Sequence, residues 1–102
     1  MTDTRYHNDT AISPAALRER LAQSADVVML DVRSAGEFGA GHIPGALNVP
    51  LDQLRGYTAR ITAADRALVL VCQSGARSET ARRRLAEAGA TSGRVLTGGM
   101  GA

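Results

Sequence analysis

The chain of 102 residues contains a single cysteine, Cys72, at the point where an apolar run gives way to a short polar loop. Gly75 and its small neighbours allow a tight turn in which several backbone N–H groups point at one atom. The residues after Arg77 have helical periodicity, and the N-terminus of a helix is partly positive. Because such surroundings lower the pKa of a thiol, and because the thiolate is the nucleophilic form, the sequence predicts a reactive cysteine. Arg77 offers a fork of donors that suits an oxyanion substrate.

Two other interpretations of this loop have to be weighed. A lone cysteine is often only a small apolar core residue, but the accompanying glycine, arginine and strand-to-helix junction favour function. A small phosphatase or arsenate reductase would use a longer spacing between cysteine and arginine than the four residues between Cys72 and Arg77, and Ser78 stands at the place of that arginine. The tighter loop suits one terminal sulfur atom better than a phosphoryl group.

The composition sets further limits. With 44% hydrophobic residues and a net charge of +2, we expect one globular domain over residues 10–102, preceded by a polar tail over 1–9. The absence of lysine excludes a Schiff-base or P-loop lysine. The modest charge and the 3% of aromatic residues argue against nucleic-acid binding. One cysteine allows neither an internal disulfide nor a cysteine-based zinc site, so we expect no metal and no cofactor.

Nothing in the sequence indicates a leader or an anchor. Met1 to Asn8 has no apolar core of the kind found in signal peptides, and no stretch approaches the roughly 20 apolar residues of a membrane helix. We therefore expect a cytoplasmic protein without a membrane segment in this chain.

Strand-like and helix-like segments alternate along the sequence. Apolar runs predict strands over 27–32, 46–49, 67–72 and 94–97. Helical patterns follow Ser13-Pro14 as far as Gln23, begin at Ser34 with capping-box spacing, follow Pro50, and cover 78–88 before Gly89. This alternation predicts an α/β domain with a parallel sheet and helices on both faces. Cys72 then lies at the carboxyl end of a strand, where such sheets bind ligands.

Three stretches resemble the rhodanese family. They are Cys72-Gln-Ser-Gly-Ala-Arg77, the segment from Leu30-Asp-Val-Arg-Ser-Ala-Gly-Glu-Phe38 to Gly41-His-Ile-Pro-Gly-Ala-Leu-Asn-Val-Pro50, and Leu96-Thr-Gly-Gly-Met100. The resemblance covers roughly residues 11–102 and implies a mostly parallel, roughly five-stranded sheet. The family usually continues into a tryptophan and a final helix after the Gly-Gly-Met turn, so we expect a domain without that C-terminal helix.

The resemblance also implies sulfurtransferase activity. Cys72 would take a sulfane sulfur from thiosulfate or another small anionic donor, become a persulfide, and pass the sulfur to cyanide or a thiol. Arg77 would hold the oxyanion part of the donor. The rest of the anion cradle would be formed by the loop residues Gln73, Ser74, Gly75, Ala76 and Ser78.

Four polar residues of the segment from Leu30 to Pro50 allow either a chemical or a structural role. Asp31, Arg33 and Glu37 could be acid–base groups, but a cradled thiolate needs no separate base, so we expect an ion-pair and capping set. His42 could carry protons, but a turn-stabilising role is the simpler interpretation.

Three consecutive arginines of the predicted helix over 78–88 could steer anions toward the site. We expect instead that Arg82, Arg83 and Arg84 form a solvated helix face paired with Glu79 and Glu87.

Two alternatives to a free-standing enzyme stay open at this point. The domain could be a sulfur-relay module whose acceptor is another protein. It could also be a non-catalytic binding domain that keeps the fold, although an intact Cys72, Gly75 and Arg77 argues against that.

Overall fold

The computed structural model describes residues 10–23 and 26–99, and they form one five-stranded sheet. All neighbouring strands run parallel, in the order β1-β5-β4-β2-β3, so β4 is the middle strand. The strands are β1 (Ala11–Ile12), β2 (Val27–Asp31), β3 (Leu47–Asn48), β4 (Ala67–Val71) and β5 (Gly93–Leu96). The prediction of an α/β domain with a parallel sheet is thus confirmed, and the sheet is parallel throughout.

β4 has apolar packing on both of its faces. Leu68 and Leu70 belong to one buried cluster, whereas Val69 and Val71 belong to a second. Since side chains alternate across a strand, the two clusters lie on opposite faces of the sheet. This double burial explains why the strand reads as a continuous apolar run.

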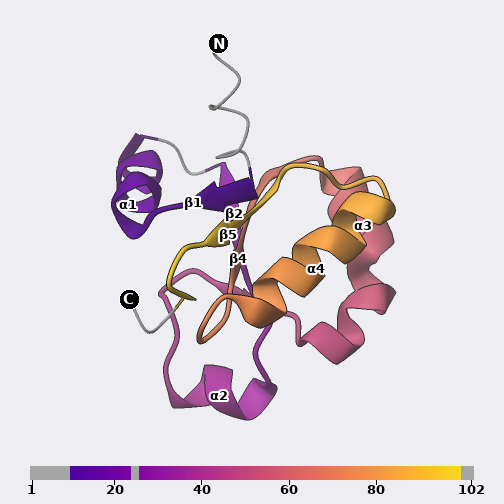
Figure 1. Ribbon diagram of the computed structural model, residues 1–102, viewed down its shortest axis with the longest axis horizontal. Coiled ribbons are helices and arrows are strands. Elements are labelled where there is room, and N and C mark those ends of the chain that lie inside the picture. Colours follow the sequence, from indigo (N-terminus) through magenta and orange to yellow (C-terminus); the bar gives the residue numbers. More distant parts are fainter. Residues whose placement is uncertain (1–9, 24–25, 100–102) are drawn as a thin grey trace.

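Helices cover both faces of the sheet (Figure 1). The helix α1 (Pro14–Gln23) supplies Leu17 to the cluster of Val69, and Phe38 of α2 (Ala35–Ala40) packs against the same cluster. On the other face, α4 (Ala76–Glu87) supplies Ala81 and Leu85 to the cluster of Leu70. The 3₁₀-helix η2 (Leu51–Tyr57) and the helix α3 (Thr58–Ala64) complete that second layer.

Three local predictions were wrong in detail. The sequence pattern missed β1, whose two residues pair with Val95 and Leu96 at the edge of the sheet. The helix expected after Pro50 is the 3₁₀-helix η2 followed by α3. The spacing of Leu51, Leu54 and Tyr57 by three residues fits the 3₁₀ period, in which positions i and i+3 share a face. Helix α4 begins at Ala76 rather than at Ser78.

Two other expectations concern the ends of the chain. The polar tail over 1–9 and the residues beyond Gly99 lie outside the described residues. Within residues 10–23 and 26–99, every helix is too short or too polar to cross a bilayer.

Candidate active site

Cys72 directly follows the middle strand β4, and its side chain turns toward the face covered by α4. The residue is 1% exposed and belongs to the apolar cluster of Leu70 and Leu85. Its Sγ atom accepts the backbone N–H of Gly75 at 2.9 Å and that of Ser78 at 3.4 Å. The sulfur therefore rests on the first turn of α4, as the sequence predicts for a strand-to-helix junction.

The surroundings of Cys72 favour the thiolate. Burial raises the pKa of the thiol, but the hydroxyl of Ser78 and the amides of Ser78, Gly75 and Ser74 outweigh it, so the pKa lies below its ordinary value of 9.0. Ser78 is fully buried, and its Oγ lacks a well-aligned hydrogen bond within the described part of the chain. The thiolate is the acceptor left for that hydroxyl. Cys72 thus has the electrostatic setting of a nucleophile.

Gly75 makes the turn between the strand and the helix. It precedes α4 with a φ of 102°, in the left-handed region that favours glycine, and its carbonyl accepts the N–H of Glu79 at 3.0 Å. The first amides of a helix have no acceptor within it, and those of Ala76 and Arg77 belong to this group. Because α4 begins at Ala76, Arg77 and Ser78 stand in its first turn rather than in a loop.

Arg77 is engaged by a protein carboxylate. Its Nη1 and Nη2 atoms donate to Oε1 and Oε2 of Glu37 at 2.7 and 3.0 Å. The hydrogen bonds from Arg77 are the largest cause that lowers the pKa of Glu37, and the amide of Ser34 is the next. The pKa of Glu37 is lowered to about 2. Glu37 also accepts the N–H of Ser34 in the capping box that starts α2. In this structure Arg77 therefore ties α4 to α2, whereas the sequence led us to expect a guanidinium free to hold a donor.

Asp31 and Arg33 form a buried pair beside this contact. Arg33 donates from Nε and Nη2 to the carboxylate of Asp31 at 2.8 to 3.1 Å, and from Nη2 to the carbonyl of Gly41 at 2.7 Å. The Nδ2 atom of Asn48 donates to the carbonyls of Asp31 and Arg33. These bonds fix the connection between β2 and β3 and so hold α2 in place. The geometry is that of a structural set.

His42 lies against Phe38 and makes no hydrogen bond to the Cys72 loop within the described ranges. The two rings stack with centroids 3.6 Å apart and an interplanar angle of 8°. Nδ1 of His42 lies 2.8 Å from the carbonyl oxygen of Phe38. This arrangement stabilises the turn after α2.

Sequence reasoning missed one residue that shapes the loop. Gly99 has a φ of +57°, and a Cβ atom there would lie 2.7 Å from the carbonyl oxygen of Gln73 and still closer to that of Cys72. The backbone after β5 therefore packs directly behind the cysteine. The pair Gly98-Gly99 after the last strand was the available signal, because glycine permits a close backbone approach.

The remaining loop residues form the rim. Gln73, Ser74 and Ala76 are exposed, so they border the path by which a small molecule would reach Sγ. Among residues 10–23 and 26–99, no three histidine, cysteine, aspartate or glutamate side chains are grouped in a way that could hold a metal ion. The assembled site offers a thiolate, converging amides and a buried hydroxyl, which is chemistry for covalent transfer through sulfur.

Comparison with characterised proteins agrees with this geometry. A sulfurtransferase of Allochromatium vinosum is 39% identical over 83% of this chain and 77% of its own length. The thiosulfate sulfurtransferase GlpE of Shewanella oneidensis is 32% identical, over 81% of each protein. Other relatives are longer proteins, of which this chain spans as little as 20%.

The fold comparison agrees as well. The human single-domain sulfurtransferase TSTD1 superposes with a TM-score of 0.75 at 32% identity, covering 87% of this chain and 89% of that one. The family model described as rhodanese-like domain matches residues 13–102, which include both the Cys72 loop and the Glu37 segment. A match over nearly the whole described fold leaves one assignment, and the chain belongs to the rhodanese-like domain family.

Proposed function

We propose that this domain transfers a sulfane sulfur through a persulfide on Cys72. The thiolate attacks the outer sulfur of thiosulfate, the S–S bond of the donor breaks, and sulfite leaves with the bonding electron pair. Cyanide then attacks the outer sulfur of the persulfide, thiocyanate leaves, and the thiolate is regenerated. A persulfide donor and a thiol acceptor follow the same two displacements, with a thiolate as the first leaving group and a new persulfide as the product.

The observation that carries this proposal is the contact of Sγ with the amides of Gly75 and Ser78. The same donors stabilise the anionic thiolate before the reaction and the thiolate that leaves when the acceptor takes the sulfur. The rim of Gln73, Ser74 and Ala76 and the first amides of α4 are the groups that would surround the outer sulfur.

The role of Arg77 is revised by its pairing with Glu37. A guanidinium held by a carboxylate is a poor clamp for a second anion, so we assign Arg77 to positioning α4 against α2. The oxyanion of a donor would then be bound mainly by backbone amides. Backbone amides do not distinguish thiosulfate from a persulfide donor. The sulfur-relay alternative therefore fits this arrangement as well as thiosulfate transfer does.

Mass spectrometry of the intact protein tests the proposal. After incubation with thiosulfate, we expect the wild type to gain one sulfur atom, to lose it on addition of cyanide, and to release thiocyanate. Cys72→Ser should gain none. A wild type that stays unmodified with thiosulfate and with a low-molecular-weight persulfide would overturn the proposal and favour a non-catalytic binding domain. Loading by the persulfide alone would support the relay role.

A further inference from the structure

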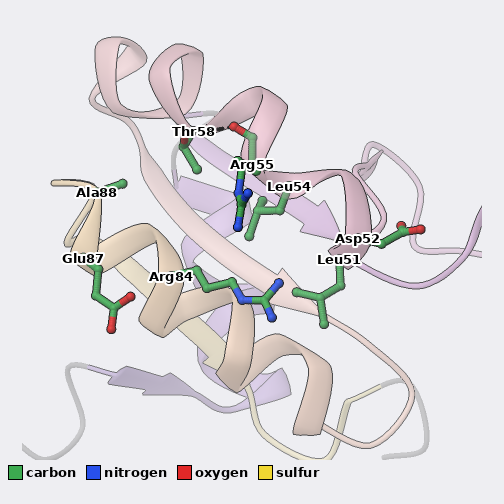
Figure 2. Close-up of a pocket in the computed structure, with 8 residues that line it drawn as sticks. All are labelled: Leu51, Asp52, Leu54, Arg55, Thr58, Arg84, Glu87 and Ala88. Atoms are coloured by element: carbon green, nitrogen blue, oxygen red, sulfur yellow. Dashed lines mark hydrogen bonds between the residues drawn. The ribbon is translucent and has the colours of Figure 1, made fainter.

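A groove separates η2 and α3 from α4 on the face of the sheet that carries Cys72 (Figure 2). Its volume is about 540 Å³, within the range of about 300–1,000 Å³ that is usual for ligand pockets. The groove is lined by Leu51, Asp52, Leu54, Arg55, Thr58, Arg84, Glu87 and Ala88. Leu54 is buried in the core and Leu51 packs against it, so this part of the wall is apolar.

Two guanidinium groups enter the groove from opposite sides. Arg55 extends from η2 and Arg84 from α4 (Figure 2). Within residues 10–23 and 26–99, neither side chain has an ion-pair partner. The other arginines of α4 are engaged, since Arg77 pairs with Glu37 while Arg82 and Arg83 pair with Glu79. The pairing expected for this helix face therefore stops short of Arg84.

Carboxylates mark the two ends of the groove. Asp52 and Glu87 line it, but their side chains point away from both guanidinium groups (Figure 2). Neither forms an ion pair in the part of the chain that the structure describes. The groove is thus positive in the middle, negative at its ends and apolar along one wall.

We propose that this groove docks a short acidic segment of a partner protein, one that carries a carboxylate side chain next to an apolar one. Arginine binds carboxylates through two parallel N–H···O bonds. The carboxylates of such a segment would neutralise the two unpaired guanidinium groups. The apolar wall takes the neighbouring side chain. A continuous phosphate backbone fits less well, because Asp52 and Glu87 would repel it at both ends.

The position of the groove relates it to the cysteine. The N–H of Leu51 donates to the carbonyl of Val32, so η2 starts at the carboxyl edge of the sheet, where Cys72 also lies. A partner bound along η2 would reach that edge. There it would be placed to accept a sulfur from Cys72. This acceptor role rests on the proposed function, whereas the docking itself does not.

Fluorescence anisotropy with a labelled peptide tests the docking. The probe is the hexapeptide Ser-Glu-Leu-Glu-Leu-Ser, and the comparison probes are its Ser-Gln-Leu-Gln-Leu-Ser counterpart and a single-stranded oligonucleotide. We expect the wild type to bind the acidic peptide in preference to both, and added salt to weaken the binding. The double variant Arg55→Gln/Arg84→Gln should weaken it about tenfold or more, since buried arginine contacts are frequent hot spots.

The matched control is Arg18→Gln/Arg20→Gln, which removes the same charge from exposed positions on α1, on the other face of the sheet. Equal weakening by both double variants, no binding by the wild type, or tighter binding of the oligonucleotide would overturn the proposal. The thermal unfolding midpoint of Arg55→Gln/Arg84→Gln should equal that of the wild type, which checks its fold. A wild type that gains no sulfur on Cys72 from thiosulfate or from a low-molecular-weight persulfide would contradict the proposed function and leave the docking result standing.

Discussion

Glu37 and Arg77 lie 40 residues apart and join α2 to α4 through hydrogen bonds of 2.7 and 3.0 Å. Both residues belong to first turns, where Glu37 closes a capping box and Arg77 directly precedes Ser78, whose amide contacts Sγ of Cys72. The pair therefore connects the frame built by Asp31 and Arg33 to the turn that carries the thiolate. Its removal should affect catalysis more than folding.

A double-mutant cycle on Glu37→Gln and Arg77→Gln measures that balance. The side chains of Glu37 and Arg77 are 39% and 38% exposed, so solvent screens the pair and each single variant should lower the free energy of unfolding only slightly. The turnover per bound donor should fall by a larger factor, because the first turn of α4 loses its position. Urea denaturation and thiosulfate:cyanide kinetics give the two values. A loss of stability that fully accounts for the loss of turnover, or additive effects on turnover, would contradict the positioning role.

The thiol of Cys72 should titrate below its ordinary value, and Ser78→Ala should raise that pKa. Burial raises the pKa of the thiol and the hydroxyl of Ser78 lowers it. Ser78→Ala therefore leaves the effect of burial less opposed. The rate of alkylation by iodoacetamide as a function of pH reports the midpoint. Since Oγ of Ser78 lacks a well-aligned bond among the described residues, we expect little loss of stability in Ser78→Ala. An unchanged midpoint would remove the hydroxyl from the site.

The same lowered pKa predicts a dependence of stability on pH. The native state releases the thiol proton at lower pH than the unfolded chain does. The resulting stabilisation is fully present above the unfolded pKa, and it is lost as the pH falls through the folded pKa. Unfolding free energies of wild type and Cys72→Ser should therefore diverge as pH rises toward 9.0, in favour of the wild type. Parallel curves would show that Cys72 is protonated in the fold.

Acid should weaken the protein through two glutamates. Glu37 and Glu79 have pKa values of about 2, lowered first by Arg77 and by Arg82 respectively. Carboxylates with lowered values stabilise the fold above their unfolded pKa of 4.5 and lose that contribution as the pH falls toward 2. The variant Glu37→Gln/Glu79→Gln should show a flatter stability profile over this window. A double variant that keeps the slope of the wild type between pH 4.5 and 2 would contradict this assignment.

Gly99→Ala should distort the loop of Cys72. The left-handed backbone costs a residue with a Cβ atom about 1–2 kcal/mol, and contact with the carbonyls of Cys72 and Gln73 adds to this. Gly39→Ala is the control, since a Cβ there meets nothing within 4 Å and lies in helix α2. Thermal stability should fall and the iodoacetamide rate of Cys72 should change in Gly99→Ala, whereas Gly39→Ala should keep the rate and should not lower stability, because alanine favours the helix. An unaltered alkylation rate would show that the glycine does not shape the site.

The sequence was informative where one segment determines its own structure. The run before Cys72 is apolar throughout because β4 is buried on both faces, and Ser34 and Glu37 form their capping box within one turn. The missed features all depend on segments that meet only in the fold. Ala11 and Ile12 are a strand only because β5 lies beside them, Gly99 approaches Cys72 across the sheet, and Glu37 reaches Arg77 from another helix. No local pattern could have shown that the guanidinium of Arg77 is occupied.

The place of β4 at the centre of the sheet has a consequence for how the site can evolve. Cys72 directly follows a strand that is hydrogen-bonded to a neighbour on each side, so the nucleophile has little freedom to move. The incoming molecule must therefore reach the sulfur in the right orientation. Choice among donors and acceptors is then left to the solvent-facing border of Gln73, Ser74 and Ala76, where side chains can change without disturbing the frame.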